Sequence, residues 1–169
     1  AASEMVSAPA GQVYPLPSCM SMDQGASLPM NYLTAHFALK VRGGLTAGDT
    51  VLVHGAAGGV GVACLQVARG LGAETIAVVS SPEKAELASK AGATHTIRRE
   101  DIPDLPRKLT GGLGVDIVID VVGGDVMTDS LRSLAPLGRV MVVGFASGEI
   151  PLVKVNRLLL RNLSVLGVA

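Results

Sequence analysis

From residue 50 onward, short apolar runs alternate with glycine or proline turns and with stretches of helical periodicity. This alternation is typical of βαβ units, in which helices join parallel strands. The apolar runs, and thus the predicted strands, cover residues 50–54, 75–79, 95–97, 115–120, 139–143 and 163–168. Helices are predicted near 60–72, 82–91, 125–134 and 154–161, and a short or irregular one over 101–110, which contains two prolines.

Most of these runs are apolar at consecutive positions, as expected for strands that helices cover on both faces. Six such strands with right-handed crossovers predict an α/β fold with a doubly wound parallel sheet in the order 3-2-1-4-5-6. Residues 1–17 contain several prolines and are predicted to be extended, whereas 23–42 carry apolar residues at helical spacing and end at Gly43-Gly44. We therefore predict a lead-in helix that packs on the sheet, within one domain over 23–169.

Composition narrows the class of protein. The 169 residues include 14 basic and 14 acidic side chains and are 49% hydrophobic, so the chain lacks the basic surplus that nucleic-acid binding requires. Glycines interrupt the longest uncharged stretch before it reaches the roughly 18 apolar residues of a membrane span. Cys19 and Cys64 have no pairing or metal-ligand spacing, which favours reduced thiols. The sequence does not begin with methionine and shows no signal-peptide pattern, so we expect a trimmed segment of a cytoplasmic protein.

A glycine-rich turn, Gly55-Ala-Ala-Gly-Gly-Val-Gly61, joins the first predicted strand to the next helix. In this position it fits the phosphate-binding turn of a dinucleotide-binding Rossmann fold, where the free N–H groups of a helix N-terminus receive a pyrophosphate. Gly58 would let the pyrophosphate approach the backbone, and Gly61 would let helix and strand pack closely. The first glycine of the usual G-x-G-x-x-G falls at Ala56, so the fit is imperfect, and a tight turn without ligand is the alternative.

The end of the second strand indicates which dinucleotide binds. An acid there would hydrogen-bond the ribose 2′-hydroxyl of NADH, but Ser80 and Ser81 follow the strand, with Lys84 shortly after them. Arg98 and Arg99 end the third strand, and hydroxyl and cationic groups together suit a 2′-phosphate. We therefore predict NADPH over NADH. A structural alternative stays open, in which the serines cap the next helix and the lysine is solvated.

Four further segments, in addition to the glycine turn, carry a family resemblance. They are Ser81-Pro-Glu-Lys-Ala-Glu-Leu-Ala88, Ala91-Gly-Ala93, Gly114-Val-Asp-Ile-Val-Ile-Asp-Val-Val-Gly123 and Val143-Gly-Phe-Ala-Ser-Gly148. Together they resemble the cofactor half of the quinone oxidoreductase branch of the medium-chain dehydrogenases/reductases. Residues 3–9 are similar to that family's last strand before the cofactor domain, and 28–35 to its helix before the first strand. The resemblance covers nearly the whole chain and implies that residues 1–22 are the end of a catalytic lobe with its linker, followed by an NAD(P)-binding domain over 23–169.

The resemblance also implies roles for individual residues. In the family, the glycine turn binds pyrophosphate, the matching serine and lysine positions bind the 2′-phosphate, and a tyrosine common after the third strand is replaced here by Arg99. The threonine that matches Thr34 lies near the nicotinamide, and the main chain of two later turns flanks the nicotinamide ribose and ring. The expected cofactor-binding residues are Thr34, Ala57, Gly58, Gly59, Val60, Gly61, Ser80, Ser81, Lys84, Arg99, Val122, Gly123, Gly144 and Phe145.

A metal site is not expected. Zinc-dependent relatives place a cysteine ligand four residues before the threonine that matches Thr34, where this chain has Met30, and a thioether cannot act as a thiolate ligand. The three histidines lie far apart without ligand spacing and are predicted to be structural, although His54 is near the expected crevice.

Together these features predict a zinc-independent, NADPH-dependent oxidoreductase that transfers hydride to a small-molecule quinone or activated enone. The resemblance implies a separate substrate lobe, so no catalytic acid or base is predicted in this chain. Two alternatives stay open: an enoyl reductase of the fatty-acid or polyketide type, and a module that binds dinucleotide without catalysis. Because the family pairs the edge strand matching 163–168 across a dimer, we expect a homodimer; a substrate lobe covering this edge is the alternative.

Overall fold

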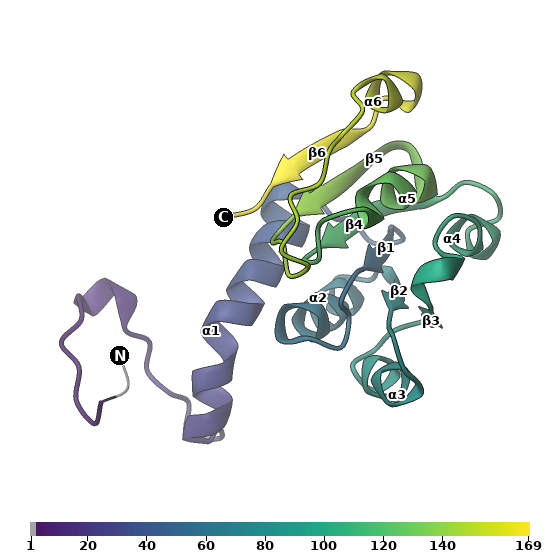
Figure 1. The fold of residues 1–169 in the computed structure, drawn as a ribbon. Coiled ribbons are helices and arrows are strands. Elements are labelled where there is room, and N and C mark those ends of the chain that lie inside the picture. Colours follow the sequence, from purple (N-terminus) through teal and green to yellow (C-terminus); the bar gives the residue numbers. More distant parts are fainter. Residues whose placement is uncertain (1–2) are drawn as a thin grey trace.

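Six parallel strands form one twisted sheet, shown in Figure 1 from a computed structural model that describes residues 3–169. The strand order is β3-β2-β1-β4-β5-β6, and every neighbouring pair is parallel. The strands are β1 (Thr50–Val53), β2 (Glu74–Val78), β3 (His95–Ile97), β4 (Val115–Asp120), β5 (Leu134–Val142) and β6 (Ser164–Gly167). The predicted doubly wound sheet and its strand order are therefore confirmed.

Helices cover both faces of the sheet. One face carries α1 (Met22–His36), its continuation η2 (Phe37–Arg42), α2 (Gly59–Gly70) and α3 (Pro82–Lys90); the other carries α4 (Leu105–Leu109), α5 (Val126–Ser133) and α6 (Asn156–Arg161). Two single 3₁₀ turns, η1 (Ala10–Gln12) and η3 (Arg99–Asp101), complete the elements. Alternate strand residues enter the two cores: Val51 and Val53 pack on the α1 and α2 side, and Leu52 on the α5 side. This two-sided burial explains why the strands are apolar at consecutive positions.

The start of β5 was predicted five residues too late. The strand begins at Leu134, which pairs with Val115, and the register between β4 and β5 then shifts. The irregularity contains Leu137, whose φ of 65° lies in the left-handed region. The Pro-Leu-Gly sequence at 136–138 therefore marks an irregularity inside the strand, whereas its residue types had predicted a turn before the strand.

Several helix and strand ends also differ from the prediction. The helix predicted over 125–134 ends at Ser133, the one predicted over 154–161 begins at Asn156, and the last strand is shorter than 163–168. The lead-in helix divides into α1 and the π-helical turn η2, which ends where the N–H of Gly43 donates to the carbonyl of Ala38 at 2.8 Å. This bond spans five residues, and the apolar spacing of the sequence does not distinguish it from an α-helical bond.

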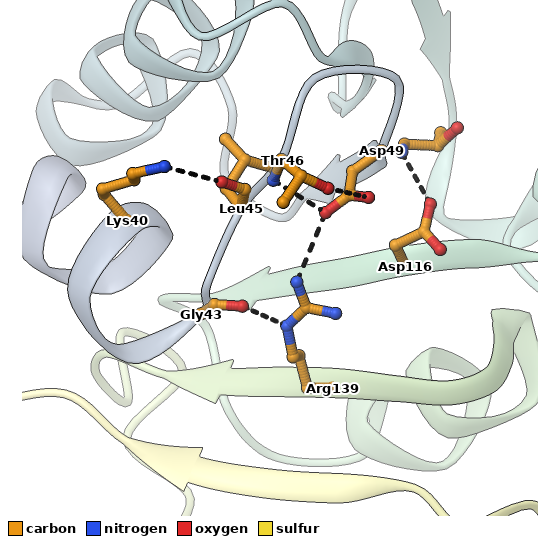
Figure 2. Close-up of polar contacts among 8 residues, drawn as sticks. Lys40, Gly43, Leu45, Thr46, Asp49, Asp116 and Arg139 are labelled. Carbon is orange, nitrogen blue, oxygen red and sulfur yellow. Dashed lines mark hydrogen bonds and ion pairs between the residues drawn. The ribbon is translucent and has the colours of Figure 1, made fainter.

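A polar network fixes the loop between η2 and β1 at the amino edge of the sheet (Figure 2). The Arg139 guanidinium donates to the carbonyl of Gly43 and pairs with the Asp49 carboxylate at 3.3 Å. Beside it, the N–H of Thr50 donates to the Asp116 carboxylate at 2.8 Å. These contacts join the helix end to β1, β4 and β5, and they lie at the opposite end of the strands from the crevice described next.

The N-terminal segment contributes little to this core. Residues 3–19 are exposed, and the segment lies apart from the sheet, to which α1 connects it (Figure 1). None of the helices in 3–169 is both long enough and apolar enough to cross a bilayer.

Candidate functional site

A crevice opens at the carboxyl edge of the sheet, between the loops that follow β1 and β4. The chain leaves β1 toward α2 on one face and leaves β4 toward α5 on the other, so the two loops diverge, as they do at ligand sites of open α/β sheets. The cavity has a volume of about 620 Å³. It is lined by His54, Gly55, Ala56, Ala57, Gly58, Val78, Val79, Ser80, Lys84, Arg98, Arg99, Glu100, Val121, Val122, Val126 and Ala146.

Residues 55–58 of the predicted glycine turn line this crevice, and α2 begins directly after them. Its N-cap residue Gly58 has an extended backbone (φ −82°, ψ 170°), and no side chain caps the helix. The first N–H groups of α2 thus have no side-chain acceptor, and the N-cap residue Gly58 lines the crevice, which is an arrangement that binds anions. A Cβ on Gly61 would meet the carbonyl of Gly55 and would lie 2.7 Å from Cα of Ala56, so only glycine lets the helix pack this closely on the turn.

The side chains after β2 form a small polar group at one end of the crevice. The Lys84 ammonium donates to the Ser80 hydroxyl at 2.8 Å, and both residues line the cavity. The Ser81 hydroxyl accepts the N–H of Lys84 at 3.4 Å and thereby caps α3. The capping role left open for the serines thus applies to Ser81, whereas Ser80 and Lys84 face the crevice.

The loop after β3 adds two arginines. Arg98 and Arg99 both line the cavity, together with Glu100. The Arg98 guanidinium lies 3.9 Å from the Glu100 carboxylate, and that of Arg99 forms an ion pair with Asp125, which precedes α5. Neither Arg98 nor Asp125 was among the predicted site residues. Arg98 is adjacent to the predicted residue Arg99, whereas no local sequence pattern marks Asp125.

A buried carboxylate holds the turn after β4. One oxygen of Asp120 accepts the N–H groups of Val122 and Gly123, each at 2.9 Å. Gly123 has a φ of 73°, and a Cβ there would lie 2.7 Å from the carbonyl of Glu149. The second Asp120 oxygen is buried without a hydrogen-bond partner among the residues described. Asp120 thus shapes the backbone of two predicted cofactor-binding residues.

Several predicted residues do not line this cavity: Thr34, Gly59, Val60, Gly61, Ser81, Gly123, Gly144 and Phe145. Gly144 and Phe145 belong to the loop after β5, which hydrogen-bonds to the β4 turn through the N–H of Ala146 and the carbonyl of Val121 at 3.0 Å. Phe145 is 43% exposed. Thr34 lies on α1, where its hydroxyl donates to the carbonyl of Met30 at 2.7 Å. It lines a separate, mostly apolar cavity of about 400 Å³ whose other walls are Leu33, Phe37, Val143, Val168 and Ala169.

His54 lies in the wall of the crevice but is 2% exposed. Its Nε2 shares a hydrogen bond with the Ser130 hydroxyl at 2.7 Å. Burial lowers the pKa of His54 to about 4, despite the opposing charge of Asp120. The imidazole is therefore neutral near pH 7, which agrees with the structural role expected for it.

The donor groups of residues 3–169 do not converge on a metal site. No three His, Cys, Asp or Glu side chains in this range are placed to share an ion. Cys64 is buried inside α2, where burial raises the pKa of its thiol to about 12, and Met30 is exposed on α1. The side chains described thus do not fit the thiolate and imidazole set that zinc prefers.

A glycine turn at the switch point of a doubly wound sheet defines a Rossmann domain of the cofactor-binding type. The family model for zinc-binding dehydrogenases matches residues 59–169, so the chain belongs to this family. The resemblance to the quinone oxidoreductase branch of the medium-chain dehydrogenases/reductases is confirmed by the relatives below.

The quinone oxidoreductase-like protein 2 of Bos taurus is 44% identical over 158 residues, which are 92% of this chain and 45% of that protein. The solved structure of mycobacterial Rv1454c complexed with NADPH is 38% identical with a TM-score of 0.90, over 96% of this chain and 51% of that one. The CurK enoyl reductase is 33% identical with a TM-score of 0.80, over 92% of this chain and 47% of that one. The chain thus spans about half the length of the relatives it matches.

Proposed function

We propose that this chain is the NADPH-binding domain of an oxidoreductase that transfers hydride to a quinone or an activated enone. The observation that carries the proposal is the carboxyl-edge crevice, which joins an uncapped glycine turn to a hydroxyl and cationic group and has no acid at the end of β2. The likeness to a structure solved with NADPH supports it.

The pyrophosphate is assigned to the glycine turn, at residues 57–61. The uncapped N–H groups at the start of α2 supply donors, and the positive end of the helix dipole favours the negative charge. The 2′-phosphate is assigned to Ser80, Ser81, Lys84 and Arg99. An ammonium, a guanidinium and a hydroxyl form charge-assisted hydrogen bonds with a phosphate dianion, whereas NADH offers a neutral hydroxyl at the same place.

The nicotinamide end is assigned to the β4 and β5 turns and to the apolar cavity beside Thr34. The nicotinamide supplies the hydride chemistry when it is bound. The role of this chain is orientation: Asp120 fixes the amides of Val122 and Gly123, and the loop of Gly144 and Phe145 packs against them. A catalytic acid or base is not assigned to this chain, because substrate contacts are expected from a separate lobe of which residues 1–22 would be the last part.

We also propose that the reaction proceeds without zinc. The support comes from the donor chemistry at the expected ligand position, where Met30 replaces a cysteine. Metal analysis of the purified protein tests this: stoichiometric zinc that cannot be removed without loss of activity would contradict the proposal.

Two other functions stay open. An enoyl reductase is favoured by the likeness to CurK, and a non-catalytic dinucleotide-binding module is the other alternative. NADPH oxidation by the full-length protein, assayed with quinones and with enoyl thioesters, separates the quinone oxidoreductase from the enoyl reductase. NADPH binding without hydride transfer to any of these acceptors would leave the module.

The phosphate assignment has its own test. Replacing both Lys84 and Arg99 by alanine is expected to weaken NADPH binding by about tenfold or more, because at least one charge-assisted contact is lost. NADH binding serves as the control and is expected to stay unchanged, because NADH has no 2′-phosphate. Equal weakening of both dinucleotides would refute the assignment.

A homodimer through the β6 edge is a further part of the proposal. β6 is the last strand of the sheet, and α6 and the segment before it expose Leu152, Val155, Leu159 and Leu160. An edge strand beside exposed apolar side chains favours pairing with a second copy. A monomeric mass in solution would contradict it.

We propose a cytoplasmic location because both cysteines are free thiols.

A further inference from the structure

Arg99 and Asp125 reach each other across the crevice. Arg99 begins η3 after β3, and Asp125 precedes α5 after β4. Two strands separate β3 from β4, so the ends of these strands lie about 14 Å apart. Arg99 lines the crevice, and Val126, the neighbour of Asp125, lines it too. The ion pair therefore joins two walls of the crevice at its mouth.

We propose that Asp125 is a specificity-determining residue, which competes with the 2′-phosphate of the cofactor for the Arg99 guanidinium. This inference rests on the proposed function, because it takes NADPH as the ligand. Asp125 is not among the residues of the predicted 2′-phosphate site and acts on that site from the opposite wall of the crevice.

Two physical effects of Asp125 have the same direction. Its carboxylate occupies donors of Arg99 that a phosphate would otherwise accept, and its charge repels the incoming dianion. The Arg99 and Asp125 side chains are 57% and 78% exposed, so the pair is weak and can exchange partners. NADH lacks the 2′-phosphate, so neither effect applies to it. Asp125 is therefore expected to lower the preference for NADPH without changing the affinity for NADH.

The other cations of the site differ from Arg99 in their partners. Arg98 has Glu100 at 3.9 Å, within its own loop, and Lys84 has the neutral hydroxyl of Ser80. Lys84 is thus available to a phosphate without displacing a carboxylate. The contribution of Arg99 to NADPH affinity depends on whether its guanidinium leaves Asp125. A change at this ion pair is therefore expected to alter the affinity for NADPH.

The test is a double-mutant cycle on dinucleotide affinity. Asp125→Asn removes the charge and keeps the shape, and Asn is as good an N-cap residue as Asp. It is expected to tighten NADPH binding by about two- to fivefold, the range of an exposed ion pair, and to leave NADH binding unchanged. In an Arg99→Ala background the same substitution is expected to give no gain. Asp129→Asn is the matched control, because Asp129 pairs with Arg132 within α5 and does not line the crevice.

The outcomes separate the two proposals. Absence of any gain for NADPH in Asp125→Asn, an equal gain for NADH, or a gain that persists without Arg99 would overturn the competition. If the unmodified protein binds neither dinucleotide, the proposed function fails and the inference fails with it. If the unmodified protein prefers NADPH and Asp125→Asn does not change that preference, the inference alone fails.

Discussion

Gly61, in the first turn of α2, offers a sharp test of how the glycine turn and the helix fit together. A Cβ added there would meet the carbonyl of Gly55 and would lie 2.7 Å and 2.9 Å from two backbone atoms of Ala56. These neighbours are main-chain atoms of the turn itself, so a rotamer change cannot relieve the overlap. Gly61→Ala must therefore push the helix and the turn apart.

Two opposing effects set the magnitude. Alanine is preferred over glycine inside a helix by about 0.5–1 kcal/mol, which favours the variant. Overpacking against a backbone that cannot move aside costs about 1–3 kcal/mol or more. The variant is therefore expected to lose about 1–2 kcal/mol of unfolding free energy, which lowers the midpoint of urea unfolding by roughly 1 M. Dinucleotide affinity is expected to fall as well, because the displaced turn carries the anion-binding N–H groups.

The same helix provides a control. Gly70, the last residue of α2, has no atom within 4 Å of an added Cβ. Gly70→Ala is therefore expected to leave stability unchanged or raise it, with dinucleotide affinity preserved. Urea unfolding followed by circular dichroism and calorimetric titration with NADPH measure both quantities. Wild-type stability and affinity in Gly61→Ala would refute the close-packing account of this glycine.

Three further predictions concern His54, the two cysteines and the ion pair of Arg139 with Asp49. Burial lowers the pKa of His54 to about 4, whereas the unfolded chain takes up the proton near pH 6.5, so the free energy of unfolding should fall as the pH drops through this window. His54→Gln should remove about 2 kcal/mol of the difference in unfolding free energy between pH 7 and pH 5. An equal dependence of the unfolding free energy on pH in both proteins would contradict this. Burial raises the pKa of Cys64 to about 12, so a thiol reagent should label the exposed Cys19 rapidly and Cys64 only after unfolding. Rapid labelling of both thiols in the native protein would contradict this. Arg139→Met removes the guanidinium that bonds Asp49 and the Gly43 carbonyl in Figure 2, while Asp49 keeps its hydrogen bonds from Thr46. The loss should cost about 1–3 kcal/mol in urea unfolding while dinucleotide affinity stays unchanged. A loss of affinity at full stability would show that the network serves the crevice.

The sheet was predictable from sequence because its central strands are buried on both faces. Residues 117–119 of β4 are apolar at successive positions, and their alternate side chains enter the two cores. The start of β5 was hidden because 136–138 combines proline and glycine, which signal a turn wherever they stand. The π-helical end of the lead-in helix was hidden for a different reason, since its apolar spacing does not differ from that of an α-helix.

Some features of the candidate site follow from neighbouring residues in the sequence, and others depend on contacts between distant strands. The glycine turn and the pair of Ser80 and Lys84 lie within a few residues of a strand end, so their place followed from the strand prediction. The contact of Arg99 with Asp125 spans two strands of the sheet and depends on the strand order. Asp120 is an acid at the end of a strand, which suits a cap better than proton transfer, but the sequence does not show that it caps the amides of Val122 and Gly123.

The central claim is that the carboxyl-edge crevice binds a dinucleotide and reads its 2′-phosphate. Calorimetric titration of the protein with NADPH and with NADH tests it most directly. Saturable binding of NADPH is expected, with NADH weaker by about tenfold, because the hydroxyl and cationic groups at the ends of β2 and β3 contact only the phosphorylated ribose. Equal affinities, tighter binding of NADH, or no saturable binding of either would contradict it.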